Sequence, residues 1–281
     1  MKITKKLLSD IQDFALDVSY EAGEILLKYQ KKRNSLEVIS KGQEGIASEA
    51  DIKSEEYILE RIGEIYPDHY ILAEEQYNNN ENSYEKAASA EFSWLIDPLD
   101  GTNNFVSGIP IYAVSMGLLH RGNPVLGVVY NPTSGECFFA AKGLGAHLID
   151  FRINPFKKYH LKAEKNAKEM QECVFSPAPI YDTNSKFEKH LSVFRNNIIG
   201  ARAVRRLGSA ALELCYVANG NFDGYWEKNL KPWDVAAAGV VCREAGVKLS
   251  DFNGKDFSPF DASILAAREP LHGKIFGAIK K

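Results

Sequence analysis

Apolar residues recur at steps of three and four near the start of the chain, which is the spacing of one face of an α-helix. The pattern begins at Leu7 and ends at Tyr29, and it predicts an amphipathic helix of about seven turns. Residues 50–65 repeat the pattern just before Pro67 and predict a second helix. Residues 69–75 predict a short strand that ends in two acids. The polar stretch 76–91 is interpreted as an exposed loop.

The pattern changes after Tyr112, where short apolar runs alternate with turn sequences as far as Asp150. This alternation predicts an antiparallel meander. The irregular, basic residues 151–170 are interpreted as a link to a second half in which strands and helices alternate. We expect strands at 172–176, 201–206, 222–227, 247–251 and 263–268, helices at 184–195, 209–218 and 234–245, and a final helix near the end of the sequence.

This mixture of elements predicts an α/β (α+β) fold with layers of helix and sheet. A chain of 281 residues can bury a large core. We expect residues 1–281 to form a single domain with two packed halves, approximately 1–150 and 171–281.

Composition narrows the classes of function. The chain is 45% hydrophobic and 25% charged, which is ordinary for a soluble globular protein. Its formal net charge of −3 gives no reason to expect a nucleic-acid partner. No apolar run suits a signal peptide or a membrane span, so no membrane partner is expected. The four cysteines form no C-x-x-C pair, which favours a reducing, cytoplasmic location.

The segment WLIDPLDGTNNF, residues 94–105, ends an apolar run with two aspartates three positions apart, Asp97 and Asp100. Residues 94–96 predict a buried strand. Pro98 fixes its own φ and lacks an N–H, so we expect the chain to turn here. A four-residue turn would bring both carboxylates and the Leu99 carbonyl to one spot. An ordinary surface turn is the alternative, because Asp-Pro and Asp-Gly are common turn formers.

Acids also lie at the ends of other predicted elements. Asp51 begins the second helix, Glu74 ends a strand and Asp234 begins a later helix. Each alone is explained as a helix cap or a solvated strand end. Brought together, they would require cations, because two like charges 4 Å apart repel by about 4 kcal/mol at an effective dielectric near 20. Oxygen-only ligands suit Mg²⁺, Mn²⁺ or Ca²⁺, and the six histidines show no zinc spacing.

Gly101 and Thr102 follow Asp100 directly and offer backbone N–H groups to a phosphate. Mg²⁺ held by carboxylates keeps positions open for water and for phosphate oxygens. The sequence contains no P-loop, no G-x-G-x-x-G and no G-x-S-x-G motif. The residues therefore favour phosphoryl transfer to a metal-activated water over kinase, dehydrogenase or esterase chemistry.

Two segments of the sequence resemble the signatures of the inositol monophosphatase family of Mg²⁺-dependent, Li⁺-sensitive phosphatases. WLIDPLDGTNNF resembles the first signature and WDVAAAGVVCREAG, residues 233–246, resembles the second. The resemblance implies a layered αβαβα sandwich of the sugar-phosphatase type and a homodimer. It also implies two or three Mg²⁺ ions per active site, with Mn²⁺ as a substitute. The implied substrate is a small phosphorylated polyol, most of all myo-inositol 1-phosphate.

The resemblance further implies a metal-ligand set. Glu74, Asp97 and the Leu99 carbonyl would hold the first ion. Asp97, Asp100 and Asp234 would hold the second.

Catalytic and substrate-binding roles are implied in the same way. Thr102, with Asp51 or Glu74, would position and deprotonate the nucleophilic water. The N–H groups of Gly101 and Thr102 would bind the phosphate. The hydroxyls of the substrate would contact Asp100, Ser209, Ala210 and Glu227.

A few charged residues have no assigned role. Lys41 is interpreted either as a family lysine near the metals or as a solvated surface residue. Arg202, Arg205 and Arg206 are interpreted as surface ion pairs, with an interface as the alternative.

Two other functions stay open. The first keeps the chemistry but acts on a 3′,5′-bisphosphate nucleotide, fructose 1,6-bisphosphate or histidinol phosphate. Asn103 argues against the nucleotidases, which tend to carry a lysine at this position. The second is a non-catalytic regulatory protein of the same fold, against which the complete set of acids argues.

Overall fold

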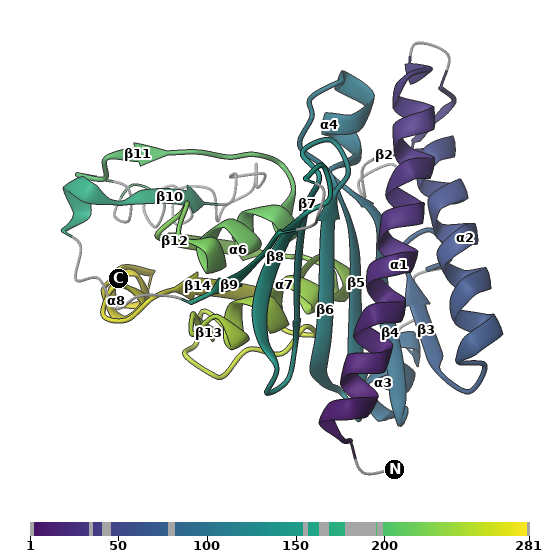
Figure 1. Cartoon of the computed structure of the whole chain (residues 1–281). Helices are drawn as coiled ribbons and strands as arrows, with labels where there is room; N and C mark the ends of the chain where they lie inside the picture. Colours follow the sequence, from purple (N-terminus) through teal and green to yellow (C-terminus); the bar gives the residue numbers. More distant parts are fainter. Residues whose placement is uncertain are drawn as a thin grey trace.

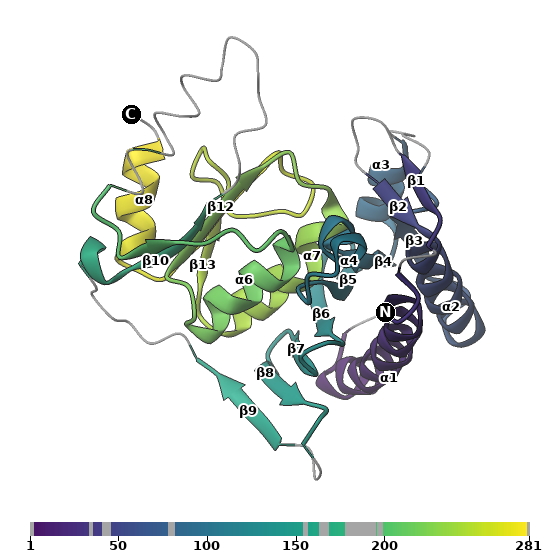
Figure 2. The same ribbon diagram turned by 90° about the horizontal axis from the view of Figure 1, so that it is seen from above.

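The computed structural model describes residues 3–33, 36–40, 46–77, 82–153, 157–162, 169–177, 195 and 199–279. Five layers follow one another (Figures 1 and 2). They are α1 (Lys5–Gln30) with α2 (Glu49–Ile65), a seven-stranded sheet, α6 (Ala210–Asn219) with α7 (Pro232–Glu244), a five-stranded sheet, and α8 (Leu271–Ile279). The predicted αβαβα sandwich is confirmed.

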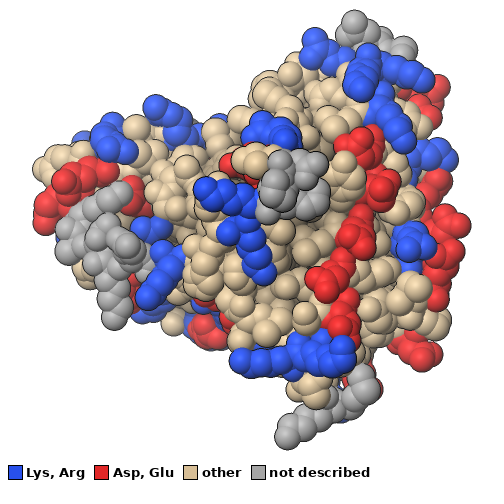
Figure 3. Space-filling model, viewed as in Figure 1, with Lys and Arg blue, Asp and Glu red and all other residues tan. Residues whose placement is uncertain are grey.

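Helix α1 forms where the apolar spacing predicts it. The Thr4 hydroxyl caps its first turn by accepting the Leu7 N–H at 3.2 Å. Its buried face packs on the seven-stranded sheet. The buried apolar residues of this face are Leu8, Ile11, Ala15, Val18, Ala22 and Leu26. The opposite face carries acids at helical spacing, and Figure 3 shows acidic side chains in a line on this side of the molecule. The helix is therefore amphipathic, as predicted.

The seven-stranded sheet has the order β3-β4-β5-β6-β7-β8-β9. Only β3 and β4 pair in parallel, and the remaining neighbours are antiparallel. The strands are β3 (Tyr70–Ala73), β4 (Phe92–Asp100), β5 (Ala113–His120), β6 (Asn123–Asn131), β7 (Glu136–Ala141), β8 (Gly145–Asp150) and β9 (Lys157–Leu161). The predicted meander over residues 112–150 is confirmed.

Two connecting segments contain more structure than the sequence suggested. The exposed loop predicted at 76–91 is wrong, because residues 82–89 form α3 (Asn82–Ser89) and Ala87 of this helix is buried. The irregular link predicted at 151–170 is also wrong, because β9 pairs with β8 from Asp150↔Lys157 to Ala146↔Leu161. A 3₁₀ turn, η3 (Met170–Glu172), follows. Residues 78–81, 154–156 and 163–168 lie outside the described residues.

The five-stranded sheet has the order β11-β10-β12-β14-β13. Its strands are β10 (Val174–Pro177), β11 (Ala203–Val204), β12 (Gly224–Lys228), β13 (Lys248–Ser250) and β14 (Ser263–Ala267). Each lies within or beside a predicted strand. Residues 184–194 of the predicted helix at 184–195 lie outside the described residues. Two short strands, β1 (Val38–Ser40) and β2 (Ile46–Ser48), form a separate hairpin-like pair before α2.

Helix α7 lies close to the seven-stranded sheet because two glycines leave room for its backbone. A Cβ atom at Gly127 of β6 would lie 2.1 Å from the Ala237 carbonyl oxygen. A Cβ atom at Gly117 of β5 would lie 2.8 Å from the Ala236 Cβ. The close approach fixes the first turn of α7, which carries Asp234, beside β4 and β5.

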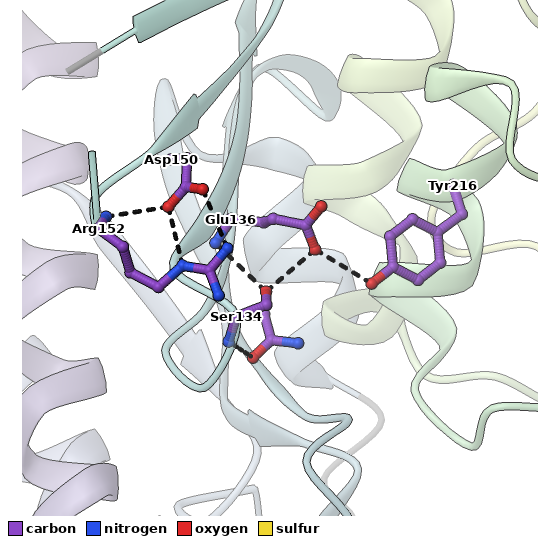
Figure 4. Close-up of polar contacts among 6 residues, drawn as sticks. Ser134, Glu136, Asp150, Arg152 and Tyr216 are labelled. Atoms are coloured by element: carbon purple, nitrogen blue, oxygen red, sulfur yellow. Dashed lines mark hydrogen bonds and ion pairs between the residues drawn. The ribbon is translucent and has the colours of Figure 1, made fainter.

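A polar contact joins α6 to β7 of the seven-stranded sheet, and others lie in the turns beside it (Figure 4). Glu136 accepts from the Ser134 hydroxyl at 3.0 Å and from the Tyr216 hydroxyl of α6 at 3.4 Å. Asp150 binds Arg152 through both carboxylate oxygens, each at 3.0 Å. These bonds hold the β6–β7 turn and the end of β8 in place. None of the helices in the described ranges is both long and apolar enough to cross a membrane.

Candidate metal centre

Three acids from separate elements meet at one end of the sheet. Glu74 follows β3, Asp97 lies in β4 and Asp234 lies in the first turn of α7. One carboxylate oxygen from each lies within 4.8 Å of the other two. The Glu74 N–H donates to the Ile96 carbonyl at 3.1 Å, which extends the pairing of β3 with β4 and places Glu74 beside Asp97. Sheet pairing and helix packing therefore bring together three acids that are far apart in sequence.

A β-bulge explains why Asp97 and Asp100 share one face of β4. Asp97 pairs with Ser115 and Asp100 pairs with Ala113, so β4 holds one residue more than β5 between these pairs. Ser115 and Ala113 are two positions apart and face the same side, and their partners do the same. The predicted four-residue turn is wrong, because the chain stays in the strand through Pro98. The bulge interrupts the ladder there, so the missing N–H of proline is tolerated.

The three acids form a site of high electrostatic cost. Burial raises the pKa of Asp97 and of Asp234 well above its usual value, and the neighbouring Glu74 carboxylate raises both further. Asp97 is only 2% exposed, so water screens its charge poorly. A bound divalent cation would relieve this repulsion. An all-oxygen donor set of carboxylates fits Mg²⁺ or Mn²⁺, so the residues present can hold such an ion.

Asp100 lies beside this cluster and also binds the N-terminus of α6. The Ser209 hydroxyl and the Ala211 N–H donate to its Oδ2, at 2.5 and 2.8 Å. The Ala210 N–H donates to Oδ1 at 3.3 Å. Burial raises the pKa of Asp100 to about 7, although these hydrogen bonds act to lower it. Ser209 and Ala210, predicted to contact substrate, thus hold Asp100 in position.

Thr102 begins α4 (Thr102–Ser107) and lies between two acceptors. Its Oγ1 is 2.9 Å from Asp51 Oδ1 and 3.1 Å from the Leu99 carbonyl oxygen. A hydroxyl donates one hydrogen at a time, so Oγ1 keeps lone pairs that can accept from a water. The other oxygen of Asp51 accepts both the N–H and the hydroxyl of Ser48, at 2.8 and 2.6 Å, in a capping box that begins α2. Burial raises the pKa of Asp51 to about 6.

Gly101 makes the change from β4 to α4 possible. Its φ of 96° lies in the left-handed region, which favours glycine. A Cβ atom there would also lie 3.0 Å from the Ile111 carbonyl oxygen. Glycine at this position therefore lets Thr102 follow directly after the bulge.

A cavity of about 210 Å³ contains these groups. Nine of the eleven predicted site residues line it, namely Glu74, Asp97, Leu99, Asp100, Gly101, Thr102, Ala210, Glu227 and Asp234. The remaining two, Asp51 and Ser209, lie behind the cavity wall and bind Thr102 and Asp100 respectively. The structure thus brings the predicted residues to one place.

Glu227 lies at the end of β12, on the wall formed by the second half of the chain. Burial raises its pKa to about 7, and the Tyr225 hydroxyl donates to its carboxylate. Its position in the cavity suits the predicted contact with a hydroxyl of the substrate.

Two further residues of the cavity were missed from sequence. Glu213 of α6 accepts the Leu207 N–H at 2.7 Å and the Ser176 hydroxyl, and burial raises its pKa. An acid within the apolar helical run AALELCYVA is the signal that could have pointed to it. Arg206, interpreted as a surface ion pair, is exposed and also lines the cavity. Arg202 and Arg205 are exposed, and Lys41 lies outside the described residues.

Comparison with known proteins points to one family. The sequence profile of the inositol monophosphatase family matches residues 7–281. A protein of Neisseria meningitidis serogroup B named putative Nus factor SuhB is 37% identical over 254 residues, 90% of this chain and 91% of its own. An Aquifex aeolicus protein named fructose-1,6-bisphosphatase/inositol-1-monophosphatase is 34% identical over 263 residues, 92% and 91% of the two chains. The crystal structure of extragenic suppressor protein suhB from Bartonella henselae has a TM-score of 0.83 at 32% identity, over 97% of this chain and 99% of that one.

Proposed function

The chain belongs to the inositol monophosphatase family, and from this premise we propose that it hydrolyses a small phosphorylated polyol, first of all myo-inositol 1-phosphate, with Mg²⁺ as its cofactor. The observation that carries the proposal is the cavity in which Glu74, Asp97 and Asp234 present oxygens within 4.8 Å of one another. Acids at this spacing repel one another, with Asp97 fully buried among them, and a bound cation would relieve the repulsion. A metal in a cavity of about 210 Å³ suits the hydrolysis of a small phosphate ester.

The proposed ligands form two overlapping sets. Glu74, Asp97 and the Leu99 carbonyl would hold one ion, and Asp97, Asp100 and Asp234 would hold the second. When bound, such ions lower the pKa of a coordinated water and stabilise negative charge on the phosphate oxygens. The bulge in β4 supports this assignment, because it turns Asp97 and Asp100 to the same face.

Thr102 and Asp51 are proposed to prepare the attacking water. Thr102 Oγ1 accepts a hydrogen bond from the water while its own hydrogen points to Asp51, 2.9 Å away. With a pKa of about 6, Asp51 is ionised at neutral pH and can accept the proton. Glu74 is the alternative acceptor, because it lies beside the same cavity.

The remaining residues are proposed to bind the substrate. The N–H groups of Gly101 and Thr102 contact the phosphate, and Glu227 contacts a hydroxyl of the polyol. Asp100 contacts a second hydroxyl, oriented by its bonds from Ser209 and Ala210.

The proposal is tested by measuring phosphate release from a panel of esters, in Mg²⁺ and in excess chelator. The panel contains myo-inositol 1-phosphate, 3′-phosphoadenosine 5′-phosphate, fructose 1,6-bisphosphate and histidinol phosphate. We expect the highest kcat/KM on the inositol phosphate, dependence on Mg²⁺, and suppression by millimolar or lower Li⁺. Activity that survives exhaustive chelation would contradict the metal-dependent mechanism. A higher kcat/KM on another ester would assign the substrate to that class instead.

The name of the Neisseria relative favours a second candidate, a Nus-factor role carried out by binding. Such a role leaves the expectation of no nucleic-acid partner untested. A folded protein that releases no phosphate from any ester of the panel would favour this second candidate. The homodimer and the cytoplasmic location expected for this family member are also proposals, and sedimentation velocity tests the first.

A further inference from the structure

The cavity contains one positively charged residue among many acids. Of the described residues that line it, six are Asp or Glu and Arg206 is the single Lys or Arg. The three-acid cluster accounts for Glu74, Asp97 and Asp234, and Asp100 lies beside it. Arg206 shares the rest of the cavity with Glu213 and Glu227, two acids outside this cluster.

The backbone on both sides of Arg206 is fixed by hydrogen bonds. The Arg205 N–H donates to the Phe175 carbonyl at 2.9 Å, and the Arg205 carbonyl accepts from the Ser176 hydroxyl at 3.0 Å. On the other side, the Leu207 N–H donates to Glu213 at 2.7 Å. The Leu207 carbonyl accepts from the Asn104 amide at 2.6 Å. Arg206 therefore extends from a rigid segment that is bound to both halves of the chain.

Electrostatic effects place the guanidinium on the Glu213 and Glu227 side. Its charge lowers the pKa of both acids, against the burial that raises them. The pKa of Asp97 is raised by burial first and then by Glu74, Asp100 and Asp234, the acids around the proposed metal site. The cavity measures about 210 Å³, so a sugar-sized ligand can contact both regions at once.

We propose that Arg206 is a specificity-determining residue that binds a second anionic group, a phosphate or a carboxylate, on a polyol phosphate whose scissile phosphate lies at the three-acid cluster. This inference rests on the proposed function and extends it to substrates with two anionic groups. The planar guanidinium can donate two parallel hydrogen bonds to two oxygens of one carboxylate or phosphate. A neutral hydroxyl has a single oxygen and cannot accept both bonds in this way. The fixed backbone also spares the entropy of ordering the loop when the anion binds.

The test compares matched substrates with and without the second anion. The carboxylate pair is 6-phosphogluconate and sorbitol 6-phosphate, and the phosphate pair is myo-inositol 1,4-bisphosphate and myo-inositol 1-phosphate. For each pair the kcat/KM of the substrate with two anionic groups is divided by that of the substrate with one, and this ratio is measured in wild type, Arg206→Gln and Arg206→Lys. Arg205→Gln is the control, because it removes the same charge one residue away, from a side chain that donates to its neighbour's carbonyl.

We expect Arg206→Gln to lower this ratio about tenfold or more for at least one pair, the size of a lost hydrogen bond to a charged group. Arg206→Lys should retain part of the ratio and Arg205→Gln all of it. The pair that responds identifies the second anion as carboxylate or phosphate. A ratio unchanged in Arg206→Gln for both pairs, or lowered equally by Arg205→Gln, would overturn the proposal.

A binding measurement separates this inference from the proposed function. Calorimetry in Mg²⁺ compares Asp51→Asn with Asp51→Asn/Arg206→Gln, a background in which kcat is expected to fall about 10²–10⁴-fold. In the double variant, the substrate with two anionic groups should lose about tenfold more affinity than the substrate with one. This result supports the role of Arg206 even if wild type releases no phosphate. Equal affinities in the two backgrounds contradict it, whatever the catalytic result.

Discussion

At the scale of single residues, Asp51 differs from the other acids because it touches the cavity only through Thr102. Its carboxylate binds the Thr102 hydroxyl on one oxygen and caps α2 on the other. We therefore propose that Asp51 handles the water and does not bind metal. Asn at this position keeps the size and one acceptor oxygen, but it cannot accept a proton.

We predict that Asp51→Asn lowers kcat by about 10²–10⁴-fold, the usual contribution of a general base. The stabilisation by Mg²⁺ should remain as in wild type. Initial rates and melting temperatures in chelator and in Mg²⁺ check both parts. Asp256→Asn, an exposed acid paired with Arg243, serves as the control. Loss of the Mg²⁺ effect in Asp51→Asn would make Asp51 a ligand, and near-normal kcat would assign the base to Glu74.

Glu227 predicts a pH dependence of stability. Its folded-state pKa of about 7 lies above the usual 4.5, so between these values the folded protein holds a proton that the unfolded chain has released. Stability from this group is present at low pH and is lost as the pH rises through about 7. In chelator, we expect Glu227→Gln to lose less melting temperature than wild type between pH 5 and pH 8. If the melting temperatures of the two proteins fell equally between pH 5 and pH 8, the pKa of Glu227 would not be raised in the folded state.

The scale of elements explains how Asp234 reaches the cluster. Helix α7 contacts β5 and β6 through Gly117 and Gly127, and any side chain at Gly127 meets the helix backbone. Gly127→Ala should therefore cost about 1–3 kcal/mol of unfolding free energy, the range for overpacking. It should also weaken Mg²⁺ binding, because α7 carries a ligand. The control is Gly63→Ala in α2, where a Cβ meets nothing within 4 Å. It should stabilise the protein by about 0.5–1 kcal/mol. Urea unfolding and Mg²⁺ titration check both variants, and equal stability of the two would contradict this packing.

The same scale shows which structure was visible in the sequence. Helices α1 and α2 were predicted closely because a long apolar stripe at helical spacing reports its own burial. Strand β9 was missed because four of its five residues are exposed at a sheet edge, so no alternation of apolar residues marks it. The bulge at Asp97 was interpreted as a turn because register depends on the partner β5, which local sequence does not reveal.

Site residues were predicted unevenly for a related reason. Asp97, Asp100 and Thr102 fall within a recognisable signature. Glu213 and Arg206 reach the cavity only through contacts of the loop before α6 with Phe175 and Asn104, which are far away in sequence. That such residues meet in the cavity becomes visible only once the fold is known.

At the scale of the whole molecule, the three-acid cluster lies where β4, the end of β3 and α7 meet, and its negative charges repel one another. A ligand that binds only the folded state stabilises it by about 2.7 kcal/mol at a hundredfold excess over Kd. We predict that Mg²⁺ raises the melting temperature of wild type. Asp97→Asn, which removes one buried charge, should be as stable as wild type or more stable in chelator and should gain less from Mg²⁺. A variant that melts far lower in chelator would mean that these acids do not repel one another.

The most direct test of the central claim is phosphate release from myo-inositol 1-phosphate as a function of Mg²⁺ concentration, in wild type and in Asp97→Asn. The claim is that the acids around Asp97 bind the ion that hydrolysis requires. It predicts saturable activation of wild type by Mg²⁺, no release in chelator, and a kcat lowered by at least about 10²-fold in Asp97→Asn at saturating Mg²⁺. Wild-type release that does not depend on Mg²⁺, or near-normal kcat in Asp97→Asn, would contradict it.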